Sequence, residues 1–429
     1  MYCLLYNTVI ISEIAYELLS SDRNPDDPHA PVSPHQSVSS VQSRMRLCLT
    51  LQAVSLLASL ALVSGLAVPG PEAGYDYSWA MQGVNRTQIR EYLRELAKEP
   101  HLAGLERDEN LAQWIAEEWR SLGLDEVRVE GYSMLLDYPD RDRPNYLRLY
   151  DSDDNEIWRS HFKEDGVDDP NFIDAFNAYS KNGIVSGDPV YVNFGTIEDF
   201  EWLEENHPGL TQDKICLARY GQIFRGNKAD NAAAFGCKGL GIFLDPSTAA
   251  QEGTEEENLY PNTFWMDGTA VQRGSLALSD GDPQTPNWPS MDHAYRLDEE
   301  DRMAYLPSIP VQPFGYTDAE VILRNMSGIE APEAWQGGIK DLKYLIGGSL
   351  KNNGKLEIEV NNKLEERVSS NVIGVIHGAV EPDRYVMYGN HRWVNCSNPM
   401  LRNPVEMSFS TKGMPGDLVH WILTLAPPR

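Results

Sequence analysis

The chain has 429 residues, which is too long for one hydrophobic core and predicts two or more domains. Hydrophobic residues make up 41% and charged residues 23%, the balance of a globular protein rather than a disordered one. The formal net charge is −28, so phosphate backbones would be repelled and nucleic acid is excluded as a partner.

The first seventy residues carry a targeting signal. An apolar stretch from Leu47 to about Val68 follows two arginines and ends in small residues and prolines. This order is typical of a secretory signal peptide, although the stretch is also nearly long enough for an uncleaved membrane anchor. We therefore expect a signal peptide or signal anchor at residues 45–70, and a secreted or single-pass membrane protein. A signal peptide normally starts a chain, so residues 1–44 are expected to be a disordered or non-native extension.

Glycosylation and cysteine patterns bear on the same route. Asn85, Asn325 and Asn395 each begin an Asn-X-Ser/Thr triplet, the acceptor for N-linked glycans in secreted proteins. Five cysteines are too few for a disulfide scaffold. Cys216, in the apolar run "KICLARY", and Cys237 are expected to be buried free thiols.

The periodicity of apolar residues predicts an α/β chain. It opens with helices near 85–100 and 110–122 and a strand over 125–132. Strands over 188–195, 214–221 and 238–246 and a helix over 227–235 then predict a small mixed sheet. An ordered loop over about 258–306, a helix over 317–326, a strand over 354–363 and paired strands over 371–378 and 384–391 complete the prediction.

Three polar motifs have competing interpretations. The acidic run Glu164–Asp169 is expected to form a solvated face. Arg225–Lys228 precedes a helix and either attracts an anion at the helix N-terminus or has a capping and surface role. His101 is read as a turn-packing residue rather than a catalytic base.

Six motifs occur in a fixed order between about residues 75 and 394: "EPHLAG", "RYGQIFRGNK", "AVQRGS", "GDPQTPNWP", "LPSIPVQPFGY" and "NVIGVIHGAVEPDRYVMYGNHR". Together they resemble the glutamate carboxypeptidase-like zinc exopeptidases, a family whose non-enzymatic cousins include the transferrin receptors. The resemblance implies an incomplete zinc-exopeptidase α/β domain with an inserted, β-rich apical domain of the protease-associated type. It also implies a small peptide substrate and a homodimer, although the family's helical dimerisation domain has no counterpart here.

The resemblance also implies domain boundaries. The N-terminal part of the peptidase domain would cover 75–134, the apical domain 135–365 and the resumed peptidase sheet 366–394. Residues 395–429 match nothing in the family and are expected to be an unrelated tail that follows a C-terminal truncation.

Zinc is the cofactor of the intact family. By resemblance, His391 aligns with the histidine of "GGHRDSWV" that ligates one zinc, and an aspartate roughly ten residues further on bridges both metals, about 3.5–4 Å apart. Here the motif reads "GNHRWV", and no acidic residue follows before Glu406. Glu406, Asp417 and His420 are the tail's substitutes, without a predicted scaffold. We therefore expect no stable zinc and no catalysis.

Substrate and calcium positions are altered as well. Thr196 stands where glutamate-selective members carry an arginine that clamps the substrate carboxylate, and Trp265 stands where they carry an asparagine. A preference other than C-terminal glutamate is therefore expected. Thr285 and Trp288 match the half of a calcium site that supplies backbone carbonyls, but its carboxylate half lies beyond the resemblance.

Three hypotheses remain open at this point. The chain is a zinc metallo-carboxypeptidase relative made catalytically incompetent, a non-catalytic secreted or membrane-tethered binding module like the transferrin receptors, or a product that does not fold stably. The last would follow from an exposed apolar strand edge over 371–388.

Overall fold

The computed structural model describes residues 82–167, 169, 171–379, 382–387, 389 and 392. The extension 1–44, the predicted signal segment 45–70, His391, Asn395 and the tail 395–429 lie outside the described residues. Within the described part of the chain, no helix combines the length and the apolar character that a membrane span requires.

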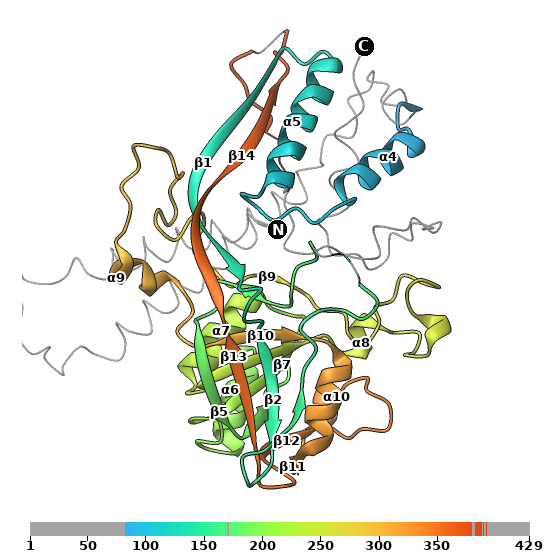
Figure 1. The fold of residues 1–429 in the computed structure, drawn as a ribbon, viewed down its shortest axis with the longest axis vertical. Coiled ribbons are helices and arrows are strands. Elements are labelled where there is room, and N and C mark those ends of the chain that lie inside the picture. Colours follow the sequence, from blue (N-terminus) through green and yellow to red (C-terminus); the bar gives the residue numbers. More distant parts are fainter. Residues whose placement is uncertain are drawn as a thin grey trace, which may run out of the picture. The chain divides into compact units, whose positions relative to one another are not determined.

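Two long antiparallel strands form a ribbon, β1 (Glu126–Pro139) and β14 (Asn362–Val375) (Figure 1). Their ladder is continuous, and Pro139 lies opposite Asn362 at its end. β1 is longer than the predicted 125–132, because backbone pairing with β14 extends it past the alternating valines that signal its start. The two predicted boundaries of the apical domain lie opposite each other in the ribbon. Leu135, the first residue of that predicted domain, pairs with Glu366, the first residue after it.

Helices α4 (Arg86–Leu96) and α5 (Glu106–Ser121) precede the ribbon and confirm the two predicted N-terminal helices. α5 packs on the ribbon so closely that a Cβ at Gly374 would meet the Trp119 ring at 2.7 Å. The helix starts earlier than predicted, because three acidic residues in its first turn favour the positive end of the helix dipole.

A six-stranded mixed sheet confirms the sheet predicted from the strand–helix–strand pattern. Its strands, in spatial order, are β10 (Val311–Phe314), β8 (Gly239–Phe243), β7 (Ile215–Arg219), β6 (Pro189–Tyr191), β12 (Leu345–Leu350) and β11 (Met326–Glu330). The first four run parallel and the last two pairings are antiparallel. Its longer helices are α6 (Ile197–Asn206), α7 (Arg225–Ala234) and α10 (Tyr316–Asn325).

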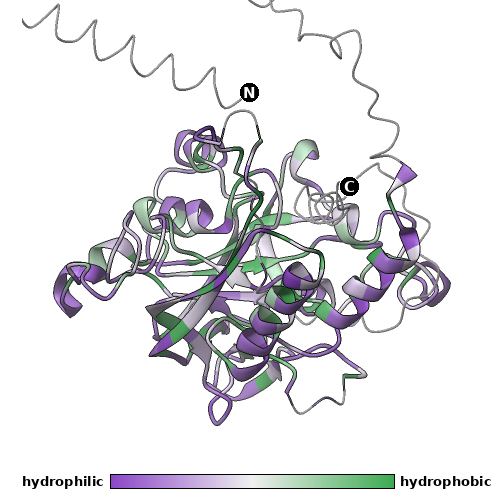
Figure 2. Cartoon of the chain, turned by 90° about the horizontal axis from the view of Figure 1, so that it is seen from above, coloured by the Kyte–Doolittle hydropathy of each residue, from purple (hydrophilic) through white to green (hydrophobic). Residues whose placement is uncertain are grey.

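An antiparallel four-stranded sheet completes the β-rich part. It contains β3 (Glu156–Arg159), β2 (Tyr146–Tyr150), β13 (Lys355–Val360) and β5 (Gly183–Gly187). Both sheets contribute to one buried apolar cluster, for example through Leu147 and Ile358 on one side and Val190 and Leu240 on the other. Hydrophobic residues accordingly gather on central strands, while helices and outer loops are mainly hydrophilic (Figure 2). All the residues of this cluster lie between Leu147 and Val360, so the β-rich part has an apolar core to which the ribbon does not contribute.

The loop predicted over 258–306 is largely irregular but takes part in the interior. It pairs β9 (Gly274–Ser275) with β4 (Asn177–Ala178) in parallel and ends in the short helix α9 (Glu299–Arg302). Nearby, Arg273 forms a two-pronged ion pair with Glu164, both N–O distances being 2.7 Å, with 1% and 4% of the two side chains exposed. The prediction that residues 164–169 form a solvated face is therefore wrong for Glu164.

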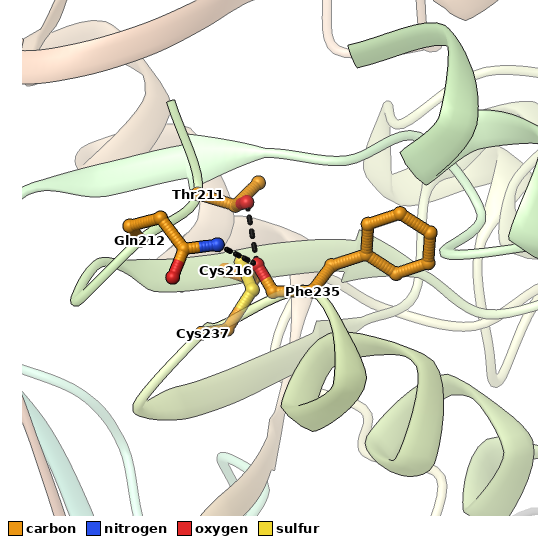
Figure 3. The surroundings of a disulfide bond; sticks show 5 residues. All are labelled: Thr211, Gln212, Cys216, Phe235 and Cys237. Carbon is orange, nitrogen blue, oxygen red and sulfur yellow. Dashed lines mark hydrogen bonds between the residues drawn. A yellow bond between two sulfur atoms is a disulfide. The ribbon is translucent and has the colours of Figure 1, made fainter. Parts of the chain in front are cut away.

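The prediction of two free thiols is also wrong. Cys216 on β7 and Cys237, just before β8, form a buried disulfide with a Cα–Cα distance of 5.9 Å (Figure 3). The carbonyl of Phe235 beside it accepts hydrogen bonds from Thr211 Oγ1 at 2.7 Å and from Gln212 Nε2 at 3.1 Å. Spacing along the chain gives no sign of this bond, because the sheet brings two distant positions together.

The described residues of the last predicted strand do not form a strand. Residues 384–387 of the predicted 384–391 strand form no ladder, and Tyr385, Val386 and Met387 are exposed. β14 already ends at Val375. Apolar alternation alone misled here, because a strand also needs a partner for its backbone groups.

Candidate functional site

The first turn of α5 places a buried carboxylate between the first and the last of the motifs that carry the family resemblance. Asp108 is 1% exposed, and its Oδ2 accepts hydrogen bonds from the Gly104 N–H at 3.0 Å and from Ser369 Oγ at 2.8 Å. Its Oδ1 accepts from Arg392 Nε at 3.1 Å and Nη2 at 2.9 Å. We call these four residues the Asp108 junction; it joins the first family motif, the ribbon and the last motif.

Backbone geometry brings the "EPHLAG" loop to this junction. Gly104 has φ +73, and a Cβ there would lie 2.7 Å from the Cβ of Arg367 on β14, so only glycine fits. Tyr138 Oη donates to the Ala103 carbonyl at 2.6 Å. His101 is buried, and its Nδ1 donates to the Glu99 carbonyl at 2.9 Å, which agrees with the predicted turn-packing role. Burial lowers the pKa of His101, which favours the neutral form of the ring.

The residues near this junction do not fit a two-zinc centre. Each zinc of such a centre needs several carboxylate or imidazole ligands. Asp108 is the carboxylate next to Arg392, but an arginine and two further donors already hold both of its oxygens. Within the described part of the chain no three His, Cys, Asp or Glu residues gather as metal ligands would. His391, the predicted zinc ligand, lies outside the described residues.

Thr196, at the position of the family's substrate-clamping arginine, caps a helix. Its Oγ1 accepts from the Asp199 N–H at 3.2 Å at the start of α6, and Asp199 Oδ2 accepts from the Thr196 N–H at 3.0 Å. This reciprocal capping box satisfies two backbone donors and leaves Thr196 buried. The side chain has no charge with which to hold a carboxylate.

Trp265, at the position of the family's pocket asparagine, is an apolar packing residue. It lies against Ala250, Leu259 and Tyr316, and its ring centroid is 4.6 Å from that of exposed Phe264. Its indole Nε1 has no hydrogen-bond partner among the described residues. The two altered pocket positions therefore present a cap and an aromatic surface rather than polar groups that would select glutamate.

The calcium positions are engaged with each other. Thr285 Oγ1 donates to the Trp288 carbonyl at 3.2 Å, and the Trp288 N–H donates to the Thr285 carbonyl at 3.0 Å. Both predicted carbonyl ligands thus close a turn within the loop. Nothing in this turn supplies the carboxylate that calcium sites require.

Two predicted sequons differ in their setting. Asn85 is exposed at the start of α4, where its Oδ1 accepts from the N–H groups of Thr87 and Gln88. The Nδ2 that would carry a glycan is not used in this cap. Asn325 is half-buried, and its Nδ2 donates to the Val321 carbonyl at 2.9 Å.

The segment Arg225–Lys228 forms the first turn of α7 instead of preceding it. Lys228 is fully buried, and its Nζ donates to the carbonyls of Gly221, at 2.7 Å, and Phe194. Burial lowers the pKa of Lys228 to about 8. The surface role considered for this lysine is therefore wrong, and it ties two loops together.

Sequence reasoning missed Asp108 and Ser369, the residues that build the junction. A usable signal was present for Asp108. It lies three and four positions before Leu111 and Ala112, on the apolar face of α5, and an acid on such a face requires a buried partner. Ser369 has no comparable signal, because its role depends on the register of β14.

Comparisons with known proteins support the resemblance. A glutamate carboxypeptidase 2 homolog of Caenorhabditis briggsae is 39% identical over 334 residues, which are 74% of this chain and 43% of the relative. Aminopeptidase NAALADL1 of Rattus norvegicus is 37% identical over 73% of this chain and 44% of its own length. Transferrin receptor protein 1 of Gallus gallus is 31% identical over 68% of this chain and 33% of the receptor.

Two further comparisons add no detail. No family model matches the chain. A solved peptidase M28 precursor from Shewanella amazonensis covers 74% of the chain at 17% identity, with a TM-score of 0.38 that is too low to establish a common fold. The ordered motifs and the curated relatives show that the chain belongs to the glutamate carboxypeptidase-like family of the zinc peptidase and transferrin-receptor superfamily. It spans less than half the length of these relatives.

Proposed function

We propose that this polypeptide is a glutamate carboxypeptidase-like protein that does not hydrolyse peptides by itself. The observation that carries the proposal is the state of Asp108. This carboxylate beside Arg392 is neutralised by the arginine and fully hydrogen-bonded. The sequence from Trp393 to Val405 offers no Asp or Glu in its place. A metal-bound water would lack both a bridging ligand and a carboxylate base.

Metal content and turnover of the purified chain test this proposal. We expect zinc well below one atom per chain after dialysis against micromolar zinc, measured by inductively coupled plasma mass spectrometry. We also expect no chelator-sensitive cleavage of acetylated dipeptides or of aminoacyl nitroanilides, which report carboxypeptidase and aminopeptidase activity. Two zinc ions per chain, together with turnover that His391→Ala abolishes, would refute the proposal.

The residues at the two substrate-pocket positions of the family bear on which peptides a complete enzyme would prefer. Thr196 is used as a helix cap and Trp265 as an apolar packing residue. A longer form of this protein with all the metal ligands would therefore favour peptides that end in an uncharged residue. A panel of acetyl dipeptides that differ only in the last residue measures this preference. A preference for glutamate over leucine would contradict it.

A binding module is the second candidate function, and the separate core of the β-rich part favours it. That part has its own apolar cluster, a buried ion pair and a disulfide. We propose that it is the apical, protease-associated-type domain of a secreted or membrane-tethered protein. Homodimers, as in the family, would need residues beyond those described.

Secretion is supported by the disulfide and by the exposed Asn85, because disulfides persist in oxidising compartments. Expression through a secretory host followed by peptide mapping tests it. We expect a glycan on Asn85 and a non-reduced peptide that links Cys216 to Cys237. Alkylation of both thiols in the native secreted protein, with Asn85 unmodified, would rule this route out.

A further inference from the structure

A short surface segment displays large apolar side chains that are exposed in the part of the chain that the structure describes. Trp288 is 65% exposed and Tyr295 81% exposed, and Met291, Met303 and Tyr305 are exposed with them. All five lie between residues 288 and 305, from the end of the "GDPQTPNWP" motif to just beyond α9. A concentration of exposed aromatic and methionine side chains of this kind is typical of protein-binding surfaces.

The same segment is strongly acidic. Along the segment, five exposed carboxylates are interspersed with the apolar residues: Asp292, Asp298, Glu299, Glu300 and Asp301. None of them takes part in an ion pair with another described residue. The segment has two arginines against these five acids, and one of them, Arg296, is directed inward. We call the five apolar residues and five carboxylates the apolar–acidic platform.

A buried polar network holds the base of this platform in place. Asp282, whose side chain is fully buried, accepts from the Leu135 N–H on β1 at 3.0 Å and from Ser290 Oγ at 3.0 Å. Arg296 donates to Asp282 Oδ2 at 3.3 Å and to the Ser133 carbonyl at 3.0 Å. The loop is thus anchored to the edge of the ribbon on both sides of Trp288 and Met291. A surface ordered in advance loses less entropy when it binds.

Charge decides which occupant fits the platform. Pairing of this segment with the same segment of a second copy would bring the same five carboxylates face to face, and these like charges would repel each other. Anionic membrane surfaces and nucleic acids are disfavoured for the same reason. A segment with an apolar face flanked by lysines or arginines would cover the aromatic residues and neutralise the uncompensated carboxylates.

We propose that the apolar–acidic platform is a docking surface for a protein partner that presents a basic amphipathic helix. The proposal does not depend on the absence of catalysis, because the platform contains none of the residues of the Asp108 junction. The two ideas therefore fail independently: zinc and turnover test one, and peptide binding tests the other.

Fluorescence anisotropy of a labelled model peptide tests the proposal on the full chain. The probe is a peptide of about 18 lysines and leucines, with the leucines at helical spacing along one face. Two control peptides have the same composition in scrambled order, or glutamate in place of lysine. We expect saturable binding of the amphipathic basic peptide at physiological salt and at least tenfold weaker binding of both controls. Equal binding of the scrambled peptide would overturn the proposal.

Matched variants locate the binding site. Trp288→Ser with Tyr295→Ser, and Glu299→Lys with Glu300→Lys, should each weaken binding about tenfold or more, because central aromatic residues and uncompensated charges carry most of such an interface. Ile184→Ser on β5 and Glu201→Lys with Glu205→Lys on α6 make the same kinds of change at other exposed positions. Thermal melting confirms that each variant is folded.

Two results would overturn the assignment. One is a loss of affinity in the α6 or β5 controls as large as in the platform variants, which would show non-specific attraction to an acidic protein. The other is a concentration-dependent dimer, seen by sedimentation, that Tyr295→Ser disrupts; the occupant would then be a second copy of this chain.

Discussion

The β-rich part between residues 140 and 361 and the ribbon with α5 are stabilised in different ways. The β-rich part encloses one apolar cluster fed by two sheets and reinforced by the buried Glu164–Arg273 pair. The ribbon has two strands and is covered by one helix, and its centre is the polar Asp108 junction. The β-rich part is stabilised mainly by buried apolar area. The ribbon combines a smaller apolar contact, to which Leu111 and Ile115 of α5 contribute, with the hydrogen bonds of one buried carboxylate. The following predictions separate these two modes, from the largest expected effect to the smallest.

Among the changes considered, removal of one partner of the buried ion pair should lower the free energy of unfolding of the β-rich part by the largest amount. Glu164→Ala leaves the Arg273 guanidinium buried without a counter-charge, which typically costs about 3–5 kcal/mol. Urea denaturation measures the loss. Glu320→Ala is the matched control, because its pair with Arg324 is exposed on both sides and should contribute less than about 1 kcal/mol. Equal losses would show that the buried pair has no special weight.

The Asp108 junction should affect the stability of the ribbon and α5 but not that of the β-rich part. Asp108→Ala removes the acceptor of four hydrogen bonds and leaves Arg392 without its counter-charge, so we expect a loss of about 2–3 kcal/mol. Hydrogen exchange should accelerate in α5 and β14 and stay unchanged in β7 and β8. Glu109→Gln is the milder control, because this neighbour is partly exposed and, within the described residues, its carboxylate accepts hydrogen bonds from Ser370 and Gln113. Faster exchange throughout both sheets would contradict the separation of the two regions.

Where the ribbon enters the β-rich part, stability should depend on pH. Burial raises the pKa of Asp137 to about 7, although its Oδ2 accepts from the Tyr179 N–H and from Asn362 Nδ2. A carboxyl group whose pKa is raised on folding stabilises the fold below its unfolded pKa of about 3.8, and this contribution is lost as pH rises to 7. We expect the contribution of Asp137 to the free energy of unfolding to fall by about 2 kcal/mol between pH 5 and pH 7.

Asp137→Asn isolates this contribution. The amide cannot ionise and still offers an oxygen to the same donors, so the difference between variant and wild type should change with pH in the predicted sense. Denaturant midpoints at pH 5, 6 and 7 measure it. A constant difference across this range would show that Asp137 does not titrate there.

The smallest effect concerns Thr196. Loss of a threonine N-cap costs about 1 kcal/mol, so Thr196→Ala should lower stability by that amount while Thr196→Ser restores most of it. Thermal melts of the two variants measure the difference. If Ala and Ser behave alike, the hydroxyl is not acting as a cap and a pocket role returns to consideration.

The sequence predicted those elements that depend on residues close together in the chain, and it did not predict contacts between residues far apart in the chain. α5 and α10 were predictable because their apolar spacing is local, and the mixed sheet because three strands and a helix follow one another closely. The Cys216–Cys237 bond and the Glu164–Arg273 pair were not, because each joins residues that only tertiary structure brings together. The strand expected at 384–391 failed for a related reason: alternation says which face is apolar, not whether a neighbouring strand exists.

The candidate site was predictable only as a set of family positions. Motif order gave the family, and the relatives confirm it. Matching positions did not reveal what the residues do, since Thr196 caps a helix and Thr285 closes a turn. Asp108 was overlooked although its place on an apolar helix face was informative. A charged residue among apolar ones is therefore a better guide to a structural centre than a matched position whose identity has changed.

The pairing of Pro139 with Asn362 at the end of the ribbon has a practical consequence. The chain leaves the ribbon at Pro139 and returns to it at Asn362. Cα atoms of such directly opposed residues in an antiparallel pair are about 5 Å apart. A two-residue turn can bridge that gap, so everything from residue 140 to residue 361 could be excised and the ribbon closed as a hairpin. The same adjacency makes the excised piece transplantable, since its two ends could be grafted into the hairpin of an unrelated host protein.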